Sequence, residues 1–167
     1  MFIIINMEKT NVMRILDQKK IKYNTYEYPH NDNECVDGEN VAKLLNQDPK
    51  RVFKTLVLQG NDKKYYVCVI PVLAELDLKL AAKCFNVKSL EMIHVKELLG
   101  ITGYIRGGCS PIGMKKFFKT TFDISAQNFN TIIFSAGKIG YQVEVSLENL
   151  SRVISFSLAD VIFGDTN

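Results

Sequence analysis

A β-hairpin is predicted near the middle of the 167-residue sequence. Residues 52–59 and 65–71 are rich in Val, Leu, Ile and Tyr, and Gly60, Asn61 and Asp62 lie between them. Turn residues between two such segments are a strong signal for antiparallel strands joined by a tight turn. The chain must therefore contain a β-sheet, and its other elements have to be understood as additions to that sheet.

The rest of the sequence alternates helical and strand patterns around the hairpin. Helices are predicted over residues 10–20, 37–48, 77–85 and 95–99, the last closed by Gly100, with two short ones after Ser146 and over 158–162. Strands are predicted over residues 21–28, 118–124, 131–134 and 142–145. No linker or repeat divides the chain, so we predict one domain over residues 1–167, in which residues 1–7 could be a disposable extension. This order favours an α/β (α+β) fold with helices packed on a mixed sheet.

Composition narrows the class of protein. With 47% apolar and 23% charged residues, the chain resembles an ordinary globular domain, and no segment is long and apolar enough for a membrane span. The four cysteines are widely spaced, without a C-x-x-C pair, and two histidines add little to a metal site. We therefore predict a protein of the reducing cytoplasm, with no metal, cofactor or membrane partner.

Lys54 is out of place in its strand. Period-two alternation puts it on the same face as Val52, Leu56 and Leu58. Because burying an unpaired ammonium is expensive, that face must open onto a cleft at Lys54, or the lysine must be paired. A lysine that guards an edge strand is the plainer interpretation, and the strand alone favours it.

A glycine-rich loop runs from Gly103 to Gly113. It matches neither a phosphate-binding P-loop nor a dinucleotide fingerprint, but its glycines would let backbone N–H groups approach an anion. A structural turn is the commoner fate of such a loop. Between Glu97 and Asp123 there is no acidic residue, and this stretch contains four basic residues, more charge than the +3 of the whole chain: Arg106, Lys115, Lys116 and Lys119. This charge favours contact with phosphates.

Three ordered segments resemble the signature segments of the YbaK/EbsC family. They are residues 52–56, the glycine-rich loop with its Gly-Gly-Cys-Ser-Pro-Ile-Gly sequence at 107–113, and Ser-Ala-Gly-Lys at 135–138. The spacing is also similar, and the likeness covers the chain from about residue 8 onward. The resemblance implies a strongly twisted, barrel-like mixed sheet, as in the editing domain of bacterial prolyl-tRNA synthetases.

The resemblance also implies a site and an activity. The chain would be a trans-editing deacylase for Cys-tRNA(Pro), an error that a synthetase pocket cannot reject by binding alone. Lys54 would be the essential residue, fixing the acceptor end and its ester. The substrate-binding residues would be Tyr26, Thr55, Gly107, Gly108, Ser110, Pro111, Gly113, Ser135 and Gly137, while the four basic residues named above would contact tRNA phosphates.

The resemblance implies substrate-assisted chemistry, in which the cysteinyl thiol attacks its own carbonyl and leaves as a thiolactone. The enzyme would supply orientation and electrostatics, and a transient complex with prolyl-tRNA synthetase would fit this role. One departure concerns substrate preference: Gln142 stands where many family members have an acid. Glu144 lies on the same strand face and could replace it.

Three alternatives stay open. Cys109 could be a nucleophile with a pKa lowered by nearby cations, although neither histidine has an evident reason to lie beside it. A non-catalytic tRNA-binding module would keep the basic loop without a formed pocket at Lys54. An editing enzyme for alanine would need a positioned water, because that substrate has no thiol.

Overall fold

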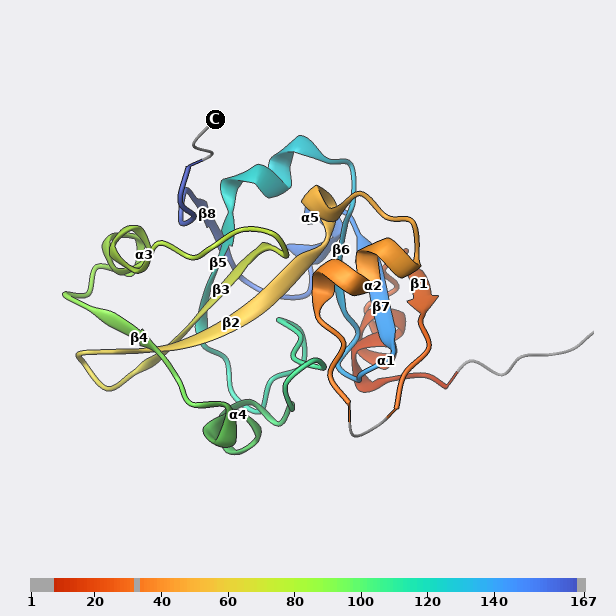
Figure 1. The fold of residues 1–167 in the computed structure, drawn as a ribbon, viewed down its shortest axis with the longest axis horizontal. Helices are drawn as coiled ribbons and strands as arrows, with labels where there is room; N and C mark the ends of the chain where they lie inside the picture. Colours follow the sequence, from red (N-terminus) through yellow and green to blue (C-terminus); the bar gives the residue numbers. More distant parts are fainter. Residues whose placement is uncertain (1–7, 32–33, 165–167) are drawn as a thin grey trace, which may run out of the picture.

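The structure is a computed structural model that describes residues 8–31 and 34–164 (Figure 1). The predicted extension at residues 1–7 lies outside the described residues. Two β-sheets and five α-helices form the described fold, which confirms the mixed α+β class. Figure 1 shows the larger sheet on the left and the smaller one on the right, with α2 in front of β7.

The larger sheet is built around the predicted hairpin. Strand β2 (Phe53–Gly60) pairs antiparallel with β3 (Tyr65–Pro71), and Lys63 closes the turn with a positive φ of 66°. Strand β4 (Leu90–Met92) extends the β2 side, while β5 (Lys119–Asp123) and β8 (Ser157–Ala159) add parallel strands beyond β3. The spatial order is β4-β2-β3-β5-β8.

The smaller sheet has the order β1-β7-β6 and is antiparallel throughout. Its strands are β1 (Asn24–Glu27), β6 (Ile132–Ser135) and β7 (Tyr141–Val145). A single isolated bridge between Val52 and Ile133 joins it to the start of the hairpin. The strands therefore form two open, linked sheets, and the barrel implied by the resemblance is not closed.

Polar side chains begin the helices where the sequence predicts. Thr10 caps α1 (Asn11–Gln18), Asp37 caps α2 (Gly38–Leu44), Asp77 caps α3 (Leu78–Phe85) and Ser146 caps α5 (Leu147–Leu150), each accepting from a backbone N–H of the first turn. Helix α4 (Val95–Thr102) continues past Gly100, which the prediction took as its end. Gly103 ends it instead, because this residue adopts the left-handed conformation with φ of 86°. Two short 3-10 helices, η1 (Pro49–Arg51) and η2 (Ile124–Asn128), complete the fold.

The helix predicted over residues 158–162 is wrong. This segment contains β8, whose residues 157–159 pair with 121–123 of β5. The side chain of Asp123 accepts a hydrogen bond of 3.2 Å from the Val161 N–H and holds the chain beyond the strand. A short apolar segment suits a helix or a strand equally well, and here the open edge of β5 decides between them.

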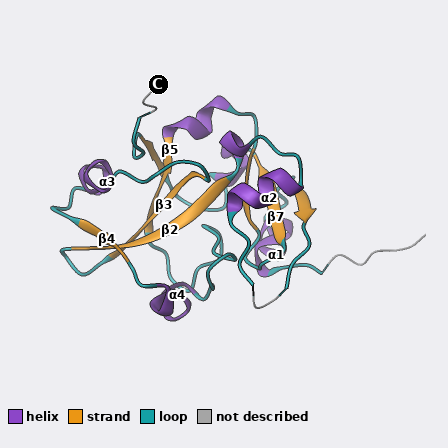
Figure 2. Ribbon diagram, in the orientation of Figure 1, coloured by secondary structure: helices purple, strands orange, loops and turns teal. Residues whose placement is uncertain are grey.

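The hairpin is buried on both faces. Phe53, Val57 and Val69 face the main core, which includes α1 and the smaller sheet. Leu58 and Ile70 face a second core beneath α3. The long loop between α4 and β5 contains no helix or strand (Figure 2). Across the described ranges, no helix is long and apolar enough to cross a membrane.

Candidate functional site

A cavity of about 460 Å³ lies where the two sheets meet the glycine-rich loop. Strand β2 forms its floor, residues 35–39 form one wall, and the ends of β6 and β7 form another. The structure brings together in it seven residues that the sequence analysis singled out: Lys54, Thr55, Arg106, Gly107, Cys109, Ser135 and Gln142.

The Lys54 side chain enters this cavity from β2, so the face it shares with Leu56 does open onto a cleft. Burial lowers the pKa of its ammonium, and the negative charge of Glu75 opposes this effect. Among the described residues, no acceptor or acid lies within hydrogen-bond or ion-pair distance of its amine. The cavity therefore contains a half-buried cation that no described residue contacts with a hydrogen bond or an ion pair, which is a costly arrangement unless a ligand supplies the opposite charge.

Thr55 is a second side chain without a partner in the cavity. Its Oγ1 is buried, and none of the described residues gives it a hydrogen bond. A buried hydroxyl usually has a partner, so the unpaired Thr55 hydroxyl is an exception at this cavity. Ser135 is differently placed, because its Oγ already accepts from the Gly137 N–H at 3.1 Å but can still donate its proton.

Position 107 requires glycine because Cys35 packs closely against its backbone. Its φ is 88°, and a Cβ there would come within 2.9 Å of the Cys35 sulfur. The wall at residue 35 can therefore lie directly against the loop. Gly107 lines the cavity, and its N–H makes no hydrogen bond to a described residue. By contrast, the Gly108 N–H already donates to the Ile105 carbonyl at 3.0 Å.

The glycine-rich loop and the 135–138 turn pack against each other. A Cβ on Gly108 would lie 3.2 Å from the backbone nitrogen of Ile139, and one on Gly137 would lie 3.0 Å from the Tyr104 ring. Tyr104 is buried, and its hydroxyl donates to the Ile112 carbonyl, which ties the loop to itself. The two glycine segments thus form one support for the cavity.

In addition to Tyr26, five predicted substrate-binding residues lie outside the cavity: Gly108, Ser110, Pro111, Gly113 and Gly137. Ser110 is fully buried, and its Oγ accepts from the Ile112 N–H, as expected for a structural turn. Pro111 and Gly113 line a separate hollow of about 140 Å³. The loop therefore reaches the cavity mainly through residues 106, 107 and 109.

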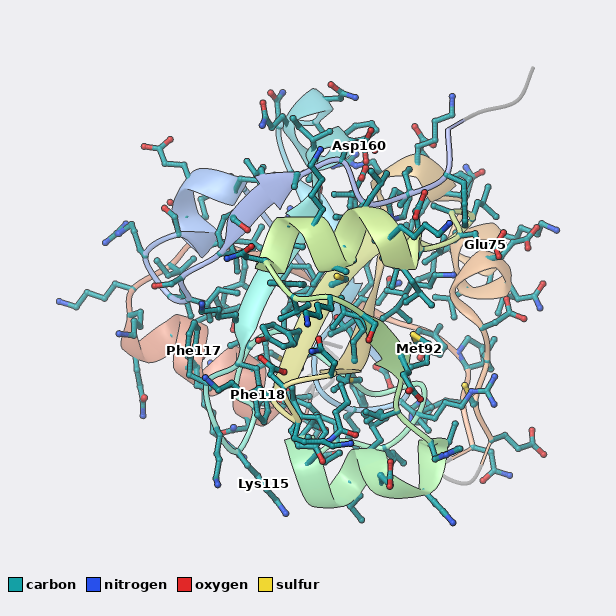
Figure 3. The ribbon with its side chains drawn as sticks, turned by 90° about the vertical axis from the view of Figure 1, so that its left-hand side faces the viewer. Glu75, Met92, Lys115, Phe117, Phe118 and Asp160 are labelled. Atoms are coloured by element: carbon teal, nitrogen blue, oxygen red, sulfur yellow. The ribbon has the colours of Figure 1, made fainter. Side chains whose placement is uncertain are left out.

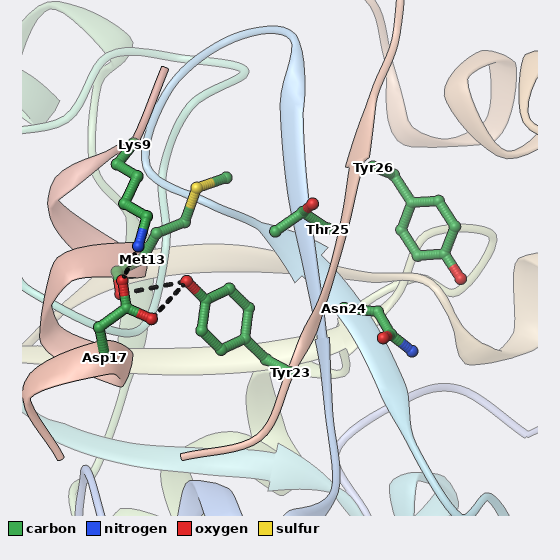
Figure 4. A pocket seen from close by; sticks show the side chains of 7 residues that line it. All are labelled: Lys9, Met13, Asp17, Tyr23, Asn24, Thr25 and Tyr26. Atoms are coloured by element: carbon green, nitrogen blue, oxygen red, sulfur yellow. Dashed lines mark hydrogen bonds and ion pairs between the residues drawn. The ribbon is translucent and has the colours of Figure 1, made fainter. Parts of the chain in front are cut away.

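Tyr26 also lies outside the cavity. Together with Asn24 it projects from one side of β1, while Tyr23 projects from the other toward Asp17 (Figure 4). The Tyr26 hydroxyl donates to the Glu144 carboxylate at 2.5 Å. Tyr28, two residues further along, lines the cavity instead. Strand alternation places residues 26 and 28 on one face, so the pattern could have indicated both.

Glu144 is engaged in a network and does not line the cavity. It is buried on β7 and forms an ion pair with Arg51, with an Nη2 to Oε2 distance of 2.7 Å. Thr131 also donates to it. Burial acts to raise the pKa of Glu144, but these hydrogen bonds and the Arg51 charge outweigh it and lower the pKa. The network leaves Glu144 unsuited to replace the missing acid.

Gln142 does line the cavity, and Gln47 orients it. The Gln47 amide donates to Gln142 Oε1 at 2.9 Å, and Gln142 is only 5% exposed. The position at which the resemblance implies an acid is therefore neutral here and is held by a second amide.

The predicted phosphate contacts divide into two groups. Arg106 is exposed and lines the cavity, whereas Lys115 and Lys116 are exposed on the loop that leads to β5, and Lys119 is exposed at the first position of β5. Figure 3 shows Lys115 and Phe117 at the surface of this loop. Only the arginine could contact the same bound group as Lys54.

Cys109 lines the cavity but is not set up as a nucleophile. Burial raises the pKa of its thiol to about 12, and a hydrogen bond with Thr102 lowers it only in part. A thiol is nucleophilic as the thiolate, which is scarce at neutral pH when the pKa is this high. Within the described part of the chain, no three potential metal ligands gather in one place.

The wall at residues 35–39 is the part of the site that the sequence analysis missed. It contributes Cys35, Asp37 and Glu39, which precede or begin α2. Nothing in their spacing points to a cavity, because their position depends on packing between α2 and the hairpin.

The sequence matches the aminoacyl-tRNA editing domain family over residues 32–153. It is 45% identical over 154 residues to a protein of Enterococcus faecalis with the provisional name Cys-tRNA(Pro)/Cys-tRNA(Cys) deacylase EbsC, covering 92% of this chain and 93% of the relative. A crystal structure provisionally described as a trans-editing enzyme for prolyl-tRNA synthetase has a TM-score of 0.77 at 18% identity. The match covers 94% of this chain and 100% of that one. Another, of a hypothetical protein, has a TM-score of 0.81 at 19% identity, with coverages of 93% and 100%. Both structures support the fold alone.

Proposed function

The chain belongs to the family of aminoacyl-tRNA editing domains, and from this premise we propose that it is a deacylase for cysteine wrongly attached to tRNA(Pro). The observation that carries this proposal is the half-buried Lys54 ammonium, which has no protein partner among the described residues and lines a cavity of about 460 Å³. The terminal adenosine of tRNA brings a phosphate and an ester to such a site. A phosphate would supply the charge that Lys54 lacks.

The cavity would also orient the ester of the bound substrate. Lys54 and Arg106 would hold the acceptor end, and the free hydroxyl of Thr55 would contact the ribose or the ester. The Gly107 N–H, which has no other described partner, is the amide we propose for the ester carbonyl. The Gly108 N–H is already used within the loop, so it is a poorer candidate.

The bound substrate would supply its own nucleophile for cleavage of the ester. The thiol sulfur of the bound cysteinyl group attacks its own carbonyl, a C–S bond forms, and the C–O bond to the ribose breaks. The thiol proton goes to the departing ribose oxygen, so the products are a thiolactone and free tRNA. No protein nucleophile is required, in keeping with the raised pKa of Cys109. Correct placement of reacting groups supplies much of the rate.

We propose that residues 1–167, with residues 1–7 as a disposable extension, act as one cytoplasmic editing domain that binds the acceptor end of tRNA, in transient association with prolyl-tRNA synthetase. The name of the Enterococcus faecalis relative also includes Cys-tRNA(Cys), so that substrate belongs in the same assay. Gln142 is neutral where many YbaK proteins carry an acid. Alanine editing by a positioned water is therefore the competing specificity within the same class.

Deacylation of Cys-tRNA(Pro), Cys-tRNA(Cys) and Ala-tRNA(Pro) tests the proposal. We expect rapid loss of the cysteinyl esters with the wild type and with Cys109→Ala, and a loss of at least about a hundredfold in rate with Lys54→Ala, typical for removal of an electrostatic catalytic group. Cleavage of the alanyl ester alone would keep the class and change the specificity. Salt-sensitive tRNA binding without any turnover would instead support a binding module.

A further inference from the structure

Two cations and two carboxylates line the cavity. The cations are Lys54 on β2 and Arg106 on the glycine-rich loop, and the carboxylates are Asp37 and Glu39 at the start of α2. In the described ranges these are the only acids that line it. Glu144, the acid closest in sequence to Gln142, is turned into its own network.

The carboxylate of Asp37 is already in use. One of its oxygens accepts from the Asn40 N–H at 2.9 Å, and the other accepts from the Asn40 side-chain amide at 3.0 Å. These bonds cap α2 and fix the side chain. Asp37 therefore cannot turn toward a ligand without releasing the helix end.

Glu39 is the carboxylate that can change partners. It pairs with Lys43 one turn later at 3.5 Å, and the two side chains are 52% and 72% exposed. An ion pair this exposed is weak and is exchanged readily.

The position of Glu39 over the site is fixed by backbone packing. A Cβ on Gly38 would come within 2.4 Å of Val72 Cγ1, so the first residue of α2 lies directly against the end of the hairpin (Figure 1). The Val72 N–H in turn donates to the Val52 carbonyl at 2.8 Å, beside the start of β2. Glu39 thus projects from a rigid wall next to the strand that carries Lys54.

An aminoacyl ester carries an ammonium next to the carbonyl that reacts. The α-amino group of a peptide has a pKa of about 8, and the neighbouring ester carbonyl lowers it, so a substantial share of these groups is charged at neutral pH. Lys54 and Arg106 repel this charge, and Gln142 supplies no compensating one. The site therefore needs a carboxylate elsewhere in the cavity.

We propose that Glu39 binds the α-ammonium of the aminoacyl group and makes the site selective for an unblocked amine. This inference rests on the proposed function, because it names the part of that substrate which Glu39 contacts. Lys43 competes with the ammonium for the same carboxylate. Glu39 is thus a specificity-determining residue. Its negative charge lies on the wall formed by residues 35–39, and the positive charge of Lys54 lies on β2.

Binding of two stable analogues tests the inference without any turnover. The first is adenosine that carries cysteine in amide linkage at its 3′ position, and the second is its N-acetyl form. We expect the wild type to bind the free amine up to about fivefold more tightly, the upper end of the range for a partly exposed charge pair. Isothermal titration at low salt measures both dissociation constants, because screening weakens such pairs.

Three variants isolate the role of Glu39. Glu39→Gln keeps the size of the side chain and should bind both analogues equally. Lys43→Ala removes the competing cation outside the cavity and should increase the preference for the free amine. Glu91→Gln makes the same charge change on the exposed β4 and should leave the preference unchanged. Thermal unfolding of each variant shows that the fold is retained.

The outcomes separate the two proposals. Loss of amine preference in Glu39→Gln alone supports the inference, whether or not the wild type hydrolyses cysteinyl-tRNA. Equal binding of both analogues by the wild type, or an unchanged preference in Glu39→Gln, overturns it even if hydrolysis is rapid. Failure of hydrolysis with an intact, Glu39-dependent preference would count against the deacylase and leave the ammonium site standing.

Discussion

The Arg51 guanidinium donates a hydrogen bond to the Glu144 carboxylate across 2.7 Å, and this ion pair joins the end of η1, just ahead of β2, to β7. The same arginine also donates to the Thr131 carbonyl at 3.1 Å, just before β6. Strands β2 and β7 carry Lys54 and Gln142, which line the floor and one wall of the cavity. This ion pair therefore adds to the Val52–Ile133 bridge and the shared core in fixing the two sheets relative to each other at the site.

Replacing Arg51 with Met should lower the free energy of unfolding by about 2–3 kcal/mol. Removal of one partner from a fully buried pair costs about 3–5 kcal/mol, and the 31% exposure of Arg51 reduces this penalty. Urea unfolding at pH 7 gives the value. Lys9→Met is the matched control, because the Lys9–Asp17 pair is exposed and should contribute less than about 1 kcal/mol. Equal losses in both variants would contradict a special role for Arg51.

The stabilisation that Glu144 gives the folded protein should decrease as the pH falls. Its network lowers the pKa in the folded protein below the ordinary 4.5, so the folded state binds the proton less readily than the unfolded state. The stabilisation is fully present above about pH 4.5 and is lost as pH falls through the lower, folded pKa. We expect the stability difference between wild type and Glu144→Gln to be constant from pH 6 to 8 and to shrink below 4.5. A difference that grows on acidification would refute this assignment.

Gly38→Ala should damage both stability and activity, because its Cβ would meet Val72 Cγ1 at 2.4 Å. Overpacking of this kind costs about 1–3 kcal/mol, and it would push the wall at α2 away from β2. Adding Val72→Ala should recover part of the loss, which a double-mutant cycle in unfolding free energy and in kcat/KM would measure.

Gly100→Ala is the control for this prediction. A Cβ at Gly100 meets no atom within 4 Å, and the residue lies inside α4. Alanine there should stabilise the protein by about 0.5–1 kcal/mol through helix propensity. A loss at Gly100 as large as the loss at Gly38 would show that the contact with Val72 is not the cause.

Lys54→Met should abolish activity and still make the protein more stable. The ammonium is half-buried, its pKa is lowered by burial, and no described residue pairs with it, so its charge destabilises the folded state at neutral pH. Removal of that charge should raise the unfolding free energy by up to about 1 kcal/mol, a trade-off often found at functional sites. Lys50→Met, at an exposed position, should change neither quantity by a comparable amount. A destabilised Lys54→Met protein would indicate a structural role.

Cys35 should react with iodoacetamide well before Cys109. Cys35 is exposed at the cavity wall, whereas burial raises the pKa of Cys109 to about 12 and keeps its thiol protonated. Peptide mass spectrometry after brief labelling at pH 8 measures the order. Because Cys35 lines the cavity, its alkylation should also slow deacylation, and Cys35→Ala should remove that sensitivity. Faster labelling of Cys109 would revive it as a candidate nucleophile.

Much of the fold could be predicted because it depends on local patterns. The hairpin follows from two β-rich segments around Gly60, and the starts of four helices follow from their capping side chains. The assignment failed at residues 158–162, where the edge of β5 recruits a strand that the segment itself does not demand. Helix α4 likewise ends at the residue that adopts the left-handed conformation, which is Gly103 and not Gly100.

For the site, the sequence by itself showed that Lys54 lies on an apolar strand face and needs a cleft, a partner or a strand edge, because alternation and the cost of an unpaired buried charge are local facts. The strand alone favours the edge, and the tertiary structure decided for the cleft, because Lys54 lines the cavity. The sequence also identified the glycine segments that approach closely. Only the tertiary structure decided that Tyr28 replaces Tyr26 at the cavity, that Glu144 is committed to Arg51, and that the start of α2 supplies Glu39. These outcomes depend on which surfaces meet across the two sheets, and contacts between distant segments leave no periodic signal along the chain.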